Sequence, residues 1–346
     1  MNEVQRALGD PQGYGNSPLA VEMKSEPIPS TAADSICIIR KISRRSSNLS
    51  ASSILDEPTV DELEIDPSHI DRGQIIATGF SSEVIKGIWK GTDVALKELH
   101  WNDRLPEKKL ESFRKELNLM FKFRHPNLVM LMGAVTKSLP RSLVLEYCCG
   151  GTLFDIVHRR RKVELSWRQR MKILLDVAKA MNYLHTSNPI VIHRDLKSLN
   201  VLLFEHVEDE YDTPIAKVSD FGLSTFVFSA THDSDTKCQS LVGTYHWMAP
   251  EITQGKQYNE KVDSYAYAIV AYEVASRTMP YEGSPYEKYE LALAVARGLR
   301  PNMSRLDKAC PSAVSIIIET CWSEDPSKRM SFDRIIAKLK SATLNS

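Results

Sequence analysis

The chain has 346 residues and is 42% hydrophobic, enough for about two domains with sizeable cores. Lysine plus arginine and aspartate plus glutamate both total 44, so no overall charge draws the chain towards nucleic acid or an acidic membrane. The longest apolar run, Tyr265–Ala271, is too short to span a bilayer. The six cysteines show no repeated CxxC spacing, which argues against a zinc site or a disulfide framework. Since the sequence starts without a signal-peptide pattern, we expect a cytoplasmic protein.

Residues 1–68 differ in kind from the rest. They are rich in Ser, Pro, Gly and Asn, show no sustained period of 3.6 or 2, and carry a basic block at 40–45 before an acidic one at 56–66. Such a segment cannot bury enough apolar surface to order itself, so we predict a disordered regulatory tail. Serines in the basic block are candidate phosphorylation sites, and a merely solvated tail is the alternative.

Short β-rich runs separated by glycines follow at residues 74–77, 83–89 and 92–99, and they predict an antiparallel meander. A helix is predicted next, because apolar residues recur at helical spacing beyond Pro106. These residues are Leu110, Phe113, Leu117, Met120 and Phe121.

Two more strands are predicted at 133–138 and 142–147, and the rest of the sequence is mostly helical. The longest helical pattern spans residues 167–185. Its apolar face consists of Met171, Leu174, Ala178 and Met181. Strands first and helices afterwards predict an α+β protein with two lobes.

Four short motifs occur in order along these elements: VALK at 94–97, HRDLKSLN at 193–200, DFG at 220–222 and APE at 249–251. Their order and rough spacing resemble the signature motifs of the protein kinases. Because four separate motifs agree, the resemblance is far more specific than any one of them alone.

The resemblance covers residues 70–339 and implies a kinase domain at 70–343. It implies an N-lobe at about 70–147, with a small antiparallel β-sheet and one helix, and a mainly helical C-lobe at about 148–343. The implied activity is transfer of phosphate from ATP, with Mg²⁺, to proteins in intracellular signalling.

Phosphoryl transfer needs positive charge on the triphosphate, a bridging metal, and a group that accepts the proton of the incoming hydroxyl. Lys97 would bind the α- and β-phosphates, and the resemblance implies Glu116 as the residue that holds this lysine. Asp195 would accept the substrate proton, while Lys197 would steady the transferred phosphoryl group.

Asn200 and Asp220 would hold Mg²⁺ through oxygen ligands, as a hard cation prefers. Each residue alone has a plainer interpretation, because a strand lysine is usually a solvated charge and a turn aspartate is usually a cap. Taken together, these residues favour catalysis.

The stretch IIATGFSSEVIKG at 75–87 resembles the phosphate-covering loop of the family, but of its three glycines only Gly79 is present. Ala77 and Ser82 occupy the other two positions. A Cβ at these positions restricts how closely the backbone approaches phosphate, so we expect weakened nucleotide binding. An inactive pseudokinase scaffold is the alternative.

The resemblance also implies a pocket for the nucleotide, lined by apolar side chains and by backbone groups of the segment that joins the lobes. Plain core packing would satisfy the same residues. The implied set is Ile76, Ala77, Gly79, Val84, Ala95, Lys97, Leu145, Glu146, Cys148 and Leu202.

Lys197 and Thr244 stand where serine/threonine kinases carry these residue types, so Ser/Thr acceptors in protein substrates are expected and dual specificity stays open. The amino-acid sequences of several motifs are similar to those of Raf-like and mixed-lineage kinases of the tyrosine-kinase-like group. Such relatives imply a homodimer as a further partner.

Residues 220–251 carry the candidate control sites, because phosphate on Thr236 or Ser240 could pair with Arg194. An upstream kinase or autophosphorylation would add it. Glu251 and Arg329 are expected to form a buried ion pair. The acidic insert at 204–217 predicts a surface hairpin, with a docking site for basic partners as the alternative.

Overall fold

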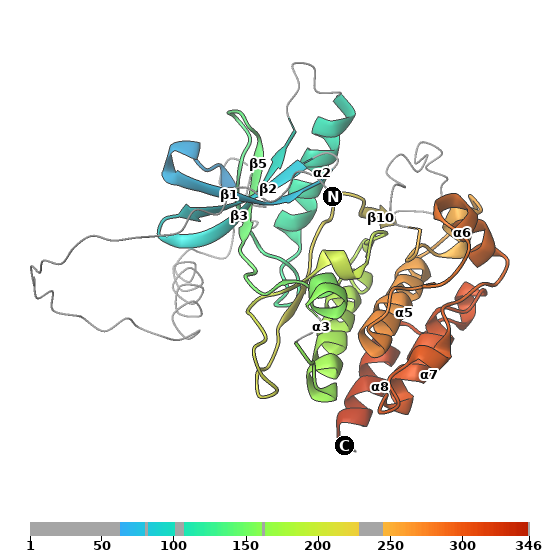
Figure 1. Cartoon of the computed structure of the whole chain (residues 1–346). Helices are drawn as coiled ribbons and strands as arrows, with labels where there is room; N and C mark the ends of the chain where they lie inside the picture. Colours follow the sequence, from blue (N-terminus) through green and yellow to red (C-terminus); the bar gives the residue numbers. More distant parts are fainter. Residues whose placement is uncertain (1–62, 80–81, 101–106, 161–162, 228–244, 345–346) are drawn as a thin grey trace, which may run out of the picture. The chain divides into compact units, whose positions relative to one another are not determined.

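The structure is a computed structural model, and it describes residues 63–79, 82–100, 107–160, 163–227 and 245–344. These residues belong to one compact unit, which runs from Pro58 to Ser346. Figure 1 shows a β-sheet with helix α2 beside it, joined to a larger and mainly helical part. This is the bilobal α+β fold that the order of elements predicts. Of the predicted tail, only residues 63–68 are described.

The smaller lobe is an antiparallel five-stranded sheet in the order β1-β2-β3-β5-β4. Helix α2 buries one apolar face, including Phe113 and Leu117, in the core cluster that continues into the larger lobe. The elements are η3 (Pro67–His69), β1 (Ile70–Thr78), β2 (Ser82–Trp89), β3 (Thr92–Leu99), α2 (Glu107–Lys122), β4 (Leu131–Val135) and β5 (Ser142–Glu146).

Strand β1 begins four residues before the predicted 74–77, and the reason is pairing across the sheet. Ile70 lies opposite Trp89 of β2, so the polar residues that follow it are held in the ladder although they are exposed. An exposed strand lacks the alternation of buried and exposed residues that sequence reasoning relies on. The β3 prediction, residues 92–99, is confirmed.

Strand β4 begins at Leu131 and ends at Val135, so the prediction of 133–138 was wrong at both ends. The amides of Thr136 and Lys137 leave the ladder and donate to the carboxylate of Glu64, at 3.1 and 3.0 Å. The next residue, Ile65, donates its amide to the Ala134 carbonyl at 2.8 Å. The segment before β1 is therefore anchored along β4.

The larger lobe is built around α3, whose observed bounds match the predicted 167–185. Ser166 and Gln169 form a reciprocal capping box at its start, which fixes where this helix begins. The helices are α3 (Trp167–His185), α4 (Pro250–Thr253), α5 (Lys261–Ser276), α6 (Lys288–Ala296), α7 (Ser312–Cys321) and α8 (Phe332–Leu344).

Short strands and single turns connect these helices. Strands β6, β8 and β9 form a three-stranded sheet and β7 pairs with β10, and the acidic insert joins β8 to β9 as predicted. The bounds are β6 (Gly151–Thr152), η4 (Asp155–Arg159), β7 (Ile190–Ile192), η5 (Ser198–Asn200), β8 (Val201–Leu203), β9 (Ala216–Val218), β10 (Thr225–Val227), η6 (Met303–Arg305) and η7 (Pro326–Lys328).

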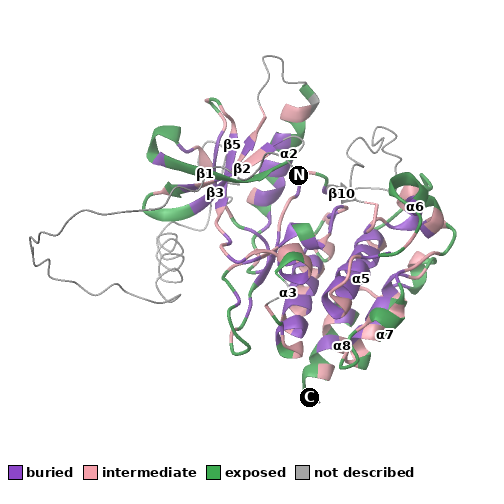
Figure 2. Cartoon of the chain, in the orientation of Figure 1, coloured by how far each residue is buried: buried purple, intermediate pink, exposed green. Residues whose placement is uncertain are grey.

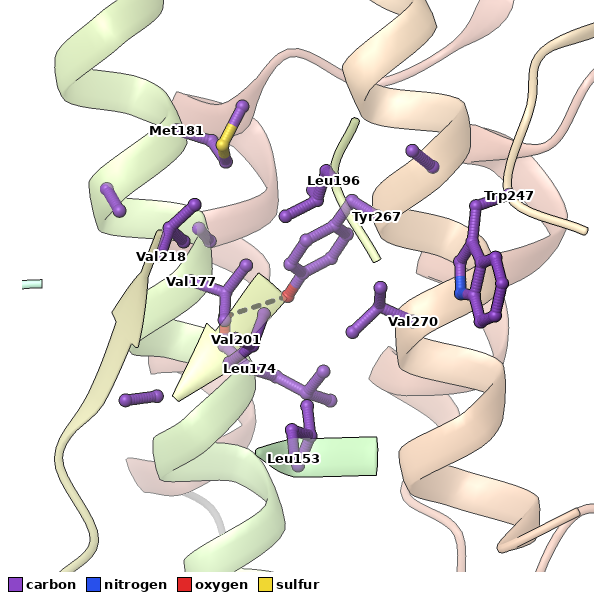
Figure 3. Close-up of a cluster of buried hydrophobic side chains, with 14 of the residues drawn as sticks. Leu153, Leu174, Val177, Met181, Leu196, Val201, Val218, Trp247, Tyr267 and Val270 are labelled. Atoms are coloured by element: carbon purple, nitrogen blue, oxygen red, sulfur yellow. Dashed lines mark hydrogen bonds between the residues drawn. The ribbon is translucent and has the colours of Figure 1, made fainter. Parts of the chain in front are cut away.

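Helix α5 is buried on all sides, from Val262 to Ala275, as expected of a helix at the centre of a core. Figure 2 shows buried residues on the facing sides of α3 and α5. In Figure 3 the Tyr267 hydroxyl of α5 donates to the Leu174 carbonyl of α3, at 2.9 Å. Leu196 and Val201 lie in the same cluster, so the HRDLKSLN loop rests on packed side chains.

The expected pair of Arg329 and Glu251 is confirmed. The two guanidinium nitrogens of Arg329 donate to the two carboxylate oxygens of Glu251, at 2.6 and 2.9 Å. Both side chains are at most 8% exposed, and Arg329 also donates to the carbonyls of Ser323 and Lys261. This pair ties the APE segment to the turn before α8.

Replacing Arg329 with methionine should lower the free energy of unfolding by about 3–5 kcal/mol, because Glu251 would be left buried without its partner. The matched control is Arg305→Met, which breaks the exposed pair of Arg305 and Glu282 and should cost about 0–1 kcal/mol. Denaturant unfolding measures both, and equal losses would contradict the prediction.

A methyl group at Gly133 should also destabilise the protein. The new Cβ would lie 2.3 Å from Cδ1 of Ile65 and 2.9 Å from the Leu63 carbonyl oxygen, so Gly133→Ala should cost about 1–3 kcal/mol. Repeating the substitution in an Ile65→Ala background removes the side-chain clash and should reduce its cost. Thermal unfolding of the wild type, the two single variants and the double variant measures the cost of Gly133→Ala in each background. An equal cost in both would refute a clash between the new Cβ and Ile65.

Candidate active site

Three residues far apart in the sequence meet at the ammonium of Lys97. Strand β3 carries Lys97 opposite Val84 of β2. Its Nζ lies 2.7 Å from Oε1 of Glu116 on α2 and 2.8 Å from Oδ1 of Asp220 in DFG. The structure thus joins a strand, a helix and a loop through one partly buried cation.

The electrostatics of this cluster keep it ionised. Burial alone would lower the pKa of Lys97, but the carboxylates of Glu116 and Asp220 outweigh burial and raise it. Burial alone would raise the pKa of Asp220, but the Lys97 ammonium lowers it to about 2. Glu116 is the more buried carboxyl, and burial raises its pKa because Lys97 offsets only part of that effect. Lys97 and Asp220 are therefore charged at neutral pH.

Asp220 has a left-handed backbone, with φ of 66°, a conformation that aspartate tolerates better than most residues. Strand β9 delivers it, and this strand is fixed by neighbours in both lobes. The Val218 amide donates to the Asn127 carbonyl at 2.8 Å, and the Val218 carbonyl accepts from Val129 at 2.9 Å. The imidazole of His193 lies 3.1 Å from the Ser219 carbonyl.

Asp195 lies in the loop between β7 and β8 and is 6% exposed. Its Oδ2 accepts from Nζ of Lys197 at 2.7 Å and from Nδ2 of Asn200 at 3.0 Å. Its Oδ1 is buried and has no hydrogen-bond partner among the described residues. Burial raises the pKa of Asp195, and the Lys197 ammonium offsets only part of this rise. One acceptor position of this carboxylate is therefore unused among the described residues.

Sequence reasoning missed Asp263, the residue that holds this loop. Its carboxylate, 1% exposed on α5, accepts from the amides of His193 and Arg194 at 2.8 and 2.9 Å. The ring of His185 lies 2.8 Å away. Burial would raise the pKa of Asp263, but these bonds lower it. The available signal was a pair of carboxylates, Asp263 and Glu273, at the two ends of the apolar run of this helix, because a buried charge must be partnered.

The apolar residues predicted to line the nucleotide pocket come from both lobes. Ala95 lies directly opposite Leu145, on adjacent strands, and each is 9% exposed. Val84 of β2 and Leu202 of β8 are partly buried and pack against the same core cluster. Ile76 on β1 is 40% exposed. The set therefore joins the sheet of the smaller lobe to β8 of the larger one.

The segment that joins the lobes makes contacts that sequence reasoning did not anticipate. The Glu146 amide donates to the Met130 carbonyl at 3.0 Å, and its carboxylate accepts from the Met130 amide at 2.8 Å. The same carboxylate pairs with Lys217 of β9 at 2.8 Å. The Cys148 carbonyl accepts a longer bond from Gly151, at 3.4 Å. Burial raises the pKa of the Cys148 thiol to about 12, so this thiol is not a reactive one.

Strands β1 and β2 remain paired close to the single glycine of the loop. Ala77 lies opposite Val84 and Thr78 opposite Glu83, so the two strands pair up to the turn itself. The Gly79 amide donates to the Ser82 carbonyl at 2.8 Å, and a Cβ on Gly79 would lie 3.2 Å from that oxygen. Glycine is retained at 79 because the carbonyl approaches so closely.

Asn200 and Asp220 suit a magnesium ion that also binds phosphate. Both offer oxygen donors, and the Asp220 side chain is 41% exposed. In the described parts of the chain, no group of three or more His, Cys, Asp or Glu side chains could hold a metal alone. Mg²⁺ commonly takes one or two protein oxygens and completes its shell with substrate phosphates, which fits these two residues.

The candidate control sites Thr236 and Ser240, and Thr244, lie outside the described residues. Arg194, their expected partner, donates to the Leu223 carbonyl at 2.5 Å and to the Tyr258 hydroxyl at 3.1 Å. This guanidinium therefore links the start of that segment to the turn after α4. No helix in the described part of the chain has the length and apolar character needed to cross a membrane.

The chain matches the family described as protein tyrosine and serine/threonine kinase over residues 70–339. It is 38% identical over 275 residues to the probable serine/threonine-protein kinase drkD of Dictyostelium discoideum, covering 80% of this chain and 20% of that protein. Two Arabidopsis thaliana proteins are also similar. The probable serine/threonine-protein kinase SIS8 is 36% identical over 289 residues, covering 84% of this chain and 26% of SIS8. The serine/threonine-protein kinase VIK is 35% identical over 284 residues, covering 81% and 62%.

The chain thus spans from 20% to 62% of the lengths of these relatives. The family match covers most of the chain, and the bilobal fold agrees with it. The chain belongs to the protein tyrosine and serine/threonine kinase family.

Proposed function

We propose that this protein transfers the γ-phosphate of ATP to serine and threonine hydroxyls of other proteins. The observation that carries the proposal is the bonded cluster of Lys97, Glu116 and Asp220, with Asp195 and its unpartnered oxygen in the adjacent loop. Such a set offers a fixed cation for phosphates, oxygen ligands for a metal and an acceptor for a hydroxyl proton.

Each residue has a definite task in this mechanism. Lys97 would bind the α- and β-phosphates, and Glu116 would keep its ammonium in place. Asn200 and Asp220 would hold Mg²⁺, which when bound neutralises charge on the phosphates. The carboxylate of Asp195 would accept a hydrogen bond from the substrate hydroxyl and orient its oxygen towards phosphorus. Lys197, 2.7 Å from Asp195, would lie beside the transferred group.

The nucleotide would lie between the lobes, against Val84, Ala95, Leu145 and Leu202. The reduced number of glycines in the phosphate loop favours the alternative of an inactive scaffold. Against that alternative, Lys97 already bonds Glu116 and Asp220, which an inactive relative has no need to maintain. We therefore favour a working enzyme.

We further infer a serine/threonine preference within the tyrosine-kinase-like group, near the Raf-like and mixed-lineage kinases. Lys197 and the wording of the HRDLKSLN and GTYHWMAPE motifs support this assignment, and dual specificity is the competing assignment. Control by phosphorylation at Thr236 or Ser240, a cytoplasmic location and a homodimer are part of the same proposal.

Lys97→Met and Asp195→Asn should each reduce phosphate transfer strongly. For Asp195→Asn, which removes the proton acceptor, kcat should fall by about 10²–10⁴-fold. Lys90→Met, which removes an exposed lysine at the end of β2, is the matched control and should leave activity unchanged. Transfer of radiolabelled phosphate to a Ser/Thr peptide library measures all three. A wild-type protein that is stabilised by ATP and magnesium but transfers no phosphate would establish the scaffold alternative.

The acid side of the pH–rate profile should depend on Lys197. Asp195 must be ionised to accept a proton, so activity is lost as pH falls through its pKa, which burial raises and Lys197 holds down. Lys197→Met should shift this loss to higher pH, by about one unit or more. Lys197→Arg keeps the charge and should leave the position of the acid limb unchanged. If the pH profiles of kcat for Lys197→Met and Lys197→Arg coincide, the ionisation of Asp195 does not determine the loss of activity at low pH.

A further inference from the structure

The turn of the single-glycine loop is held from outside by His100, a residue that no sequence motif singles out. Nε2 of His100 lies 3.0 Å from the carbonyl oxygen of Gly79. Its Nδ1 lies 3.9 Å from Oε1 of Glu83, on the second strand of the loop. The side chain is 31% exposed.

The chemistry of this contact fixes the direction of the hydrogen bond. A carbonyl oxygen only accepts, so Nε2 of His100 carries the proton and donates it to Gly79. The Gly79 amide is also bonded, to the Ser82 carbonyl at 2.8 Å. Both backbone polar groups of Gly79 therefore have partners within the protein.

The position of His100 links the turn to the phosphate-binding strand. Ser82 lies opposite Leu99 and Val84 opposite Lys97, so His100 comes one residue after the ladder ends and faces the turn. Lys97 on β3 and the donor to Gly79, one residue after this strand ends, are thus only three residues apart. A displacement of the turn relative to Lys97 would break this hydrogen bond.

We infer that His100 is a positioning residue that holds the backbone at Gly79, in the phosphate-covering loop, at a fixed place relative to Lys97. The inference rests on the proposed function, because the turn matters only if a nucleotide binds beneath it. Ala77 and Ser82 replace glycines in this loop, so the backbone there is less free to settle around phosphate during binding. A turn that is already held in place requires less ordering when the nucleotide arrives.

The test compares two substitutions of similar size and different hydrogen bonding. His100→Leu removes the donor, whereas His100→Gln retains an N–H at about the position of Nε2. The Leu variant should raise both KM and Kd for ATP by about three- to tenfold, the effect of one lost hydrogen bond, with kcat unchanged. The Gln variant should restore values close to those of wild type.

Controls separate positioning from folding. His206→Leu removes an exposed histidine from the segment between β8 and β9 and should change neither KM nor Kd. Thermal unfolding should give similar midpoints for all variants, because His100 is part-exposed at the end of a strand. If the Leu variant does not fold, His100→Ser removes the imidazole without adding apolar surface and takes its place.

The outcomes are distinct. A wild-type enzyme that transfers phosphate, with equal KM and Kd for ATP in the Leu and wild-type proteins, would overturn the role of His100 and leave the proposed function intact. Equal rises in the Leu and Gln variants would overturn the hydrogen bond as the cause. A wild-type protein that neither binds ATP nor transfers phosphate would instead remove the proposed function.

Discussion

The rest of the site depends on the two ion pairs of the Lys97 ammonium. This ammonium is shared by Glu116 of α2 and Asp220 of DFG, so one partly buried cation joins the sheet, the helix and the larger lobe. Such a charge is tolerated in the interior only while its partners stay in place. A movement of α2 or of the DFG segment would therefore change the electrostatics of the proposed phosphate site directly.

A second buried charge organises the larger lobe. Asp263 lies on α5, a helix that is buried on all sides, and it accepts from two successive amides of the HRDLKSLN loop. The loop bears the polar side chains of the site, and the packed core around Leu196 and Val201 holds the loop in place (Figure 3). This division follows a general rule, in which reactive groups on loops are held by a packed scaffold.

The phosphate-covering loop implied by the resemblance has one of its three expected glycines, and the structure shows the contacts of that glycine. The Gly79 turn is bonded to Ser82 and to His100. Farther along, Glu146 and Lys217 tie the segment between the lobes to the strand that leads into DFG. Each of these contacts restricts how one part of the site moves relative to another.

The sequence by itself determined the family, the order of the motifs, strand β3 and the whole of α3, because these depend on local pattern and on capping residues such as Ser166. Only the tertiary structure decided what partners the polar residues. Asp263 lies 70 residues from His193, and Glu64 lies 72 from Thr136, whose bond to it ends β4. The same holds for His100, which bonds the Gly79 carbonyl, and for Lys217, which bonds Glu146, because neither partner is adjacent in the sequence. Pattern along a chain reports which face of an element is apolar, but pairing between distant polar groups is set by how the elements pack.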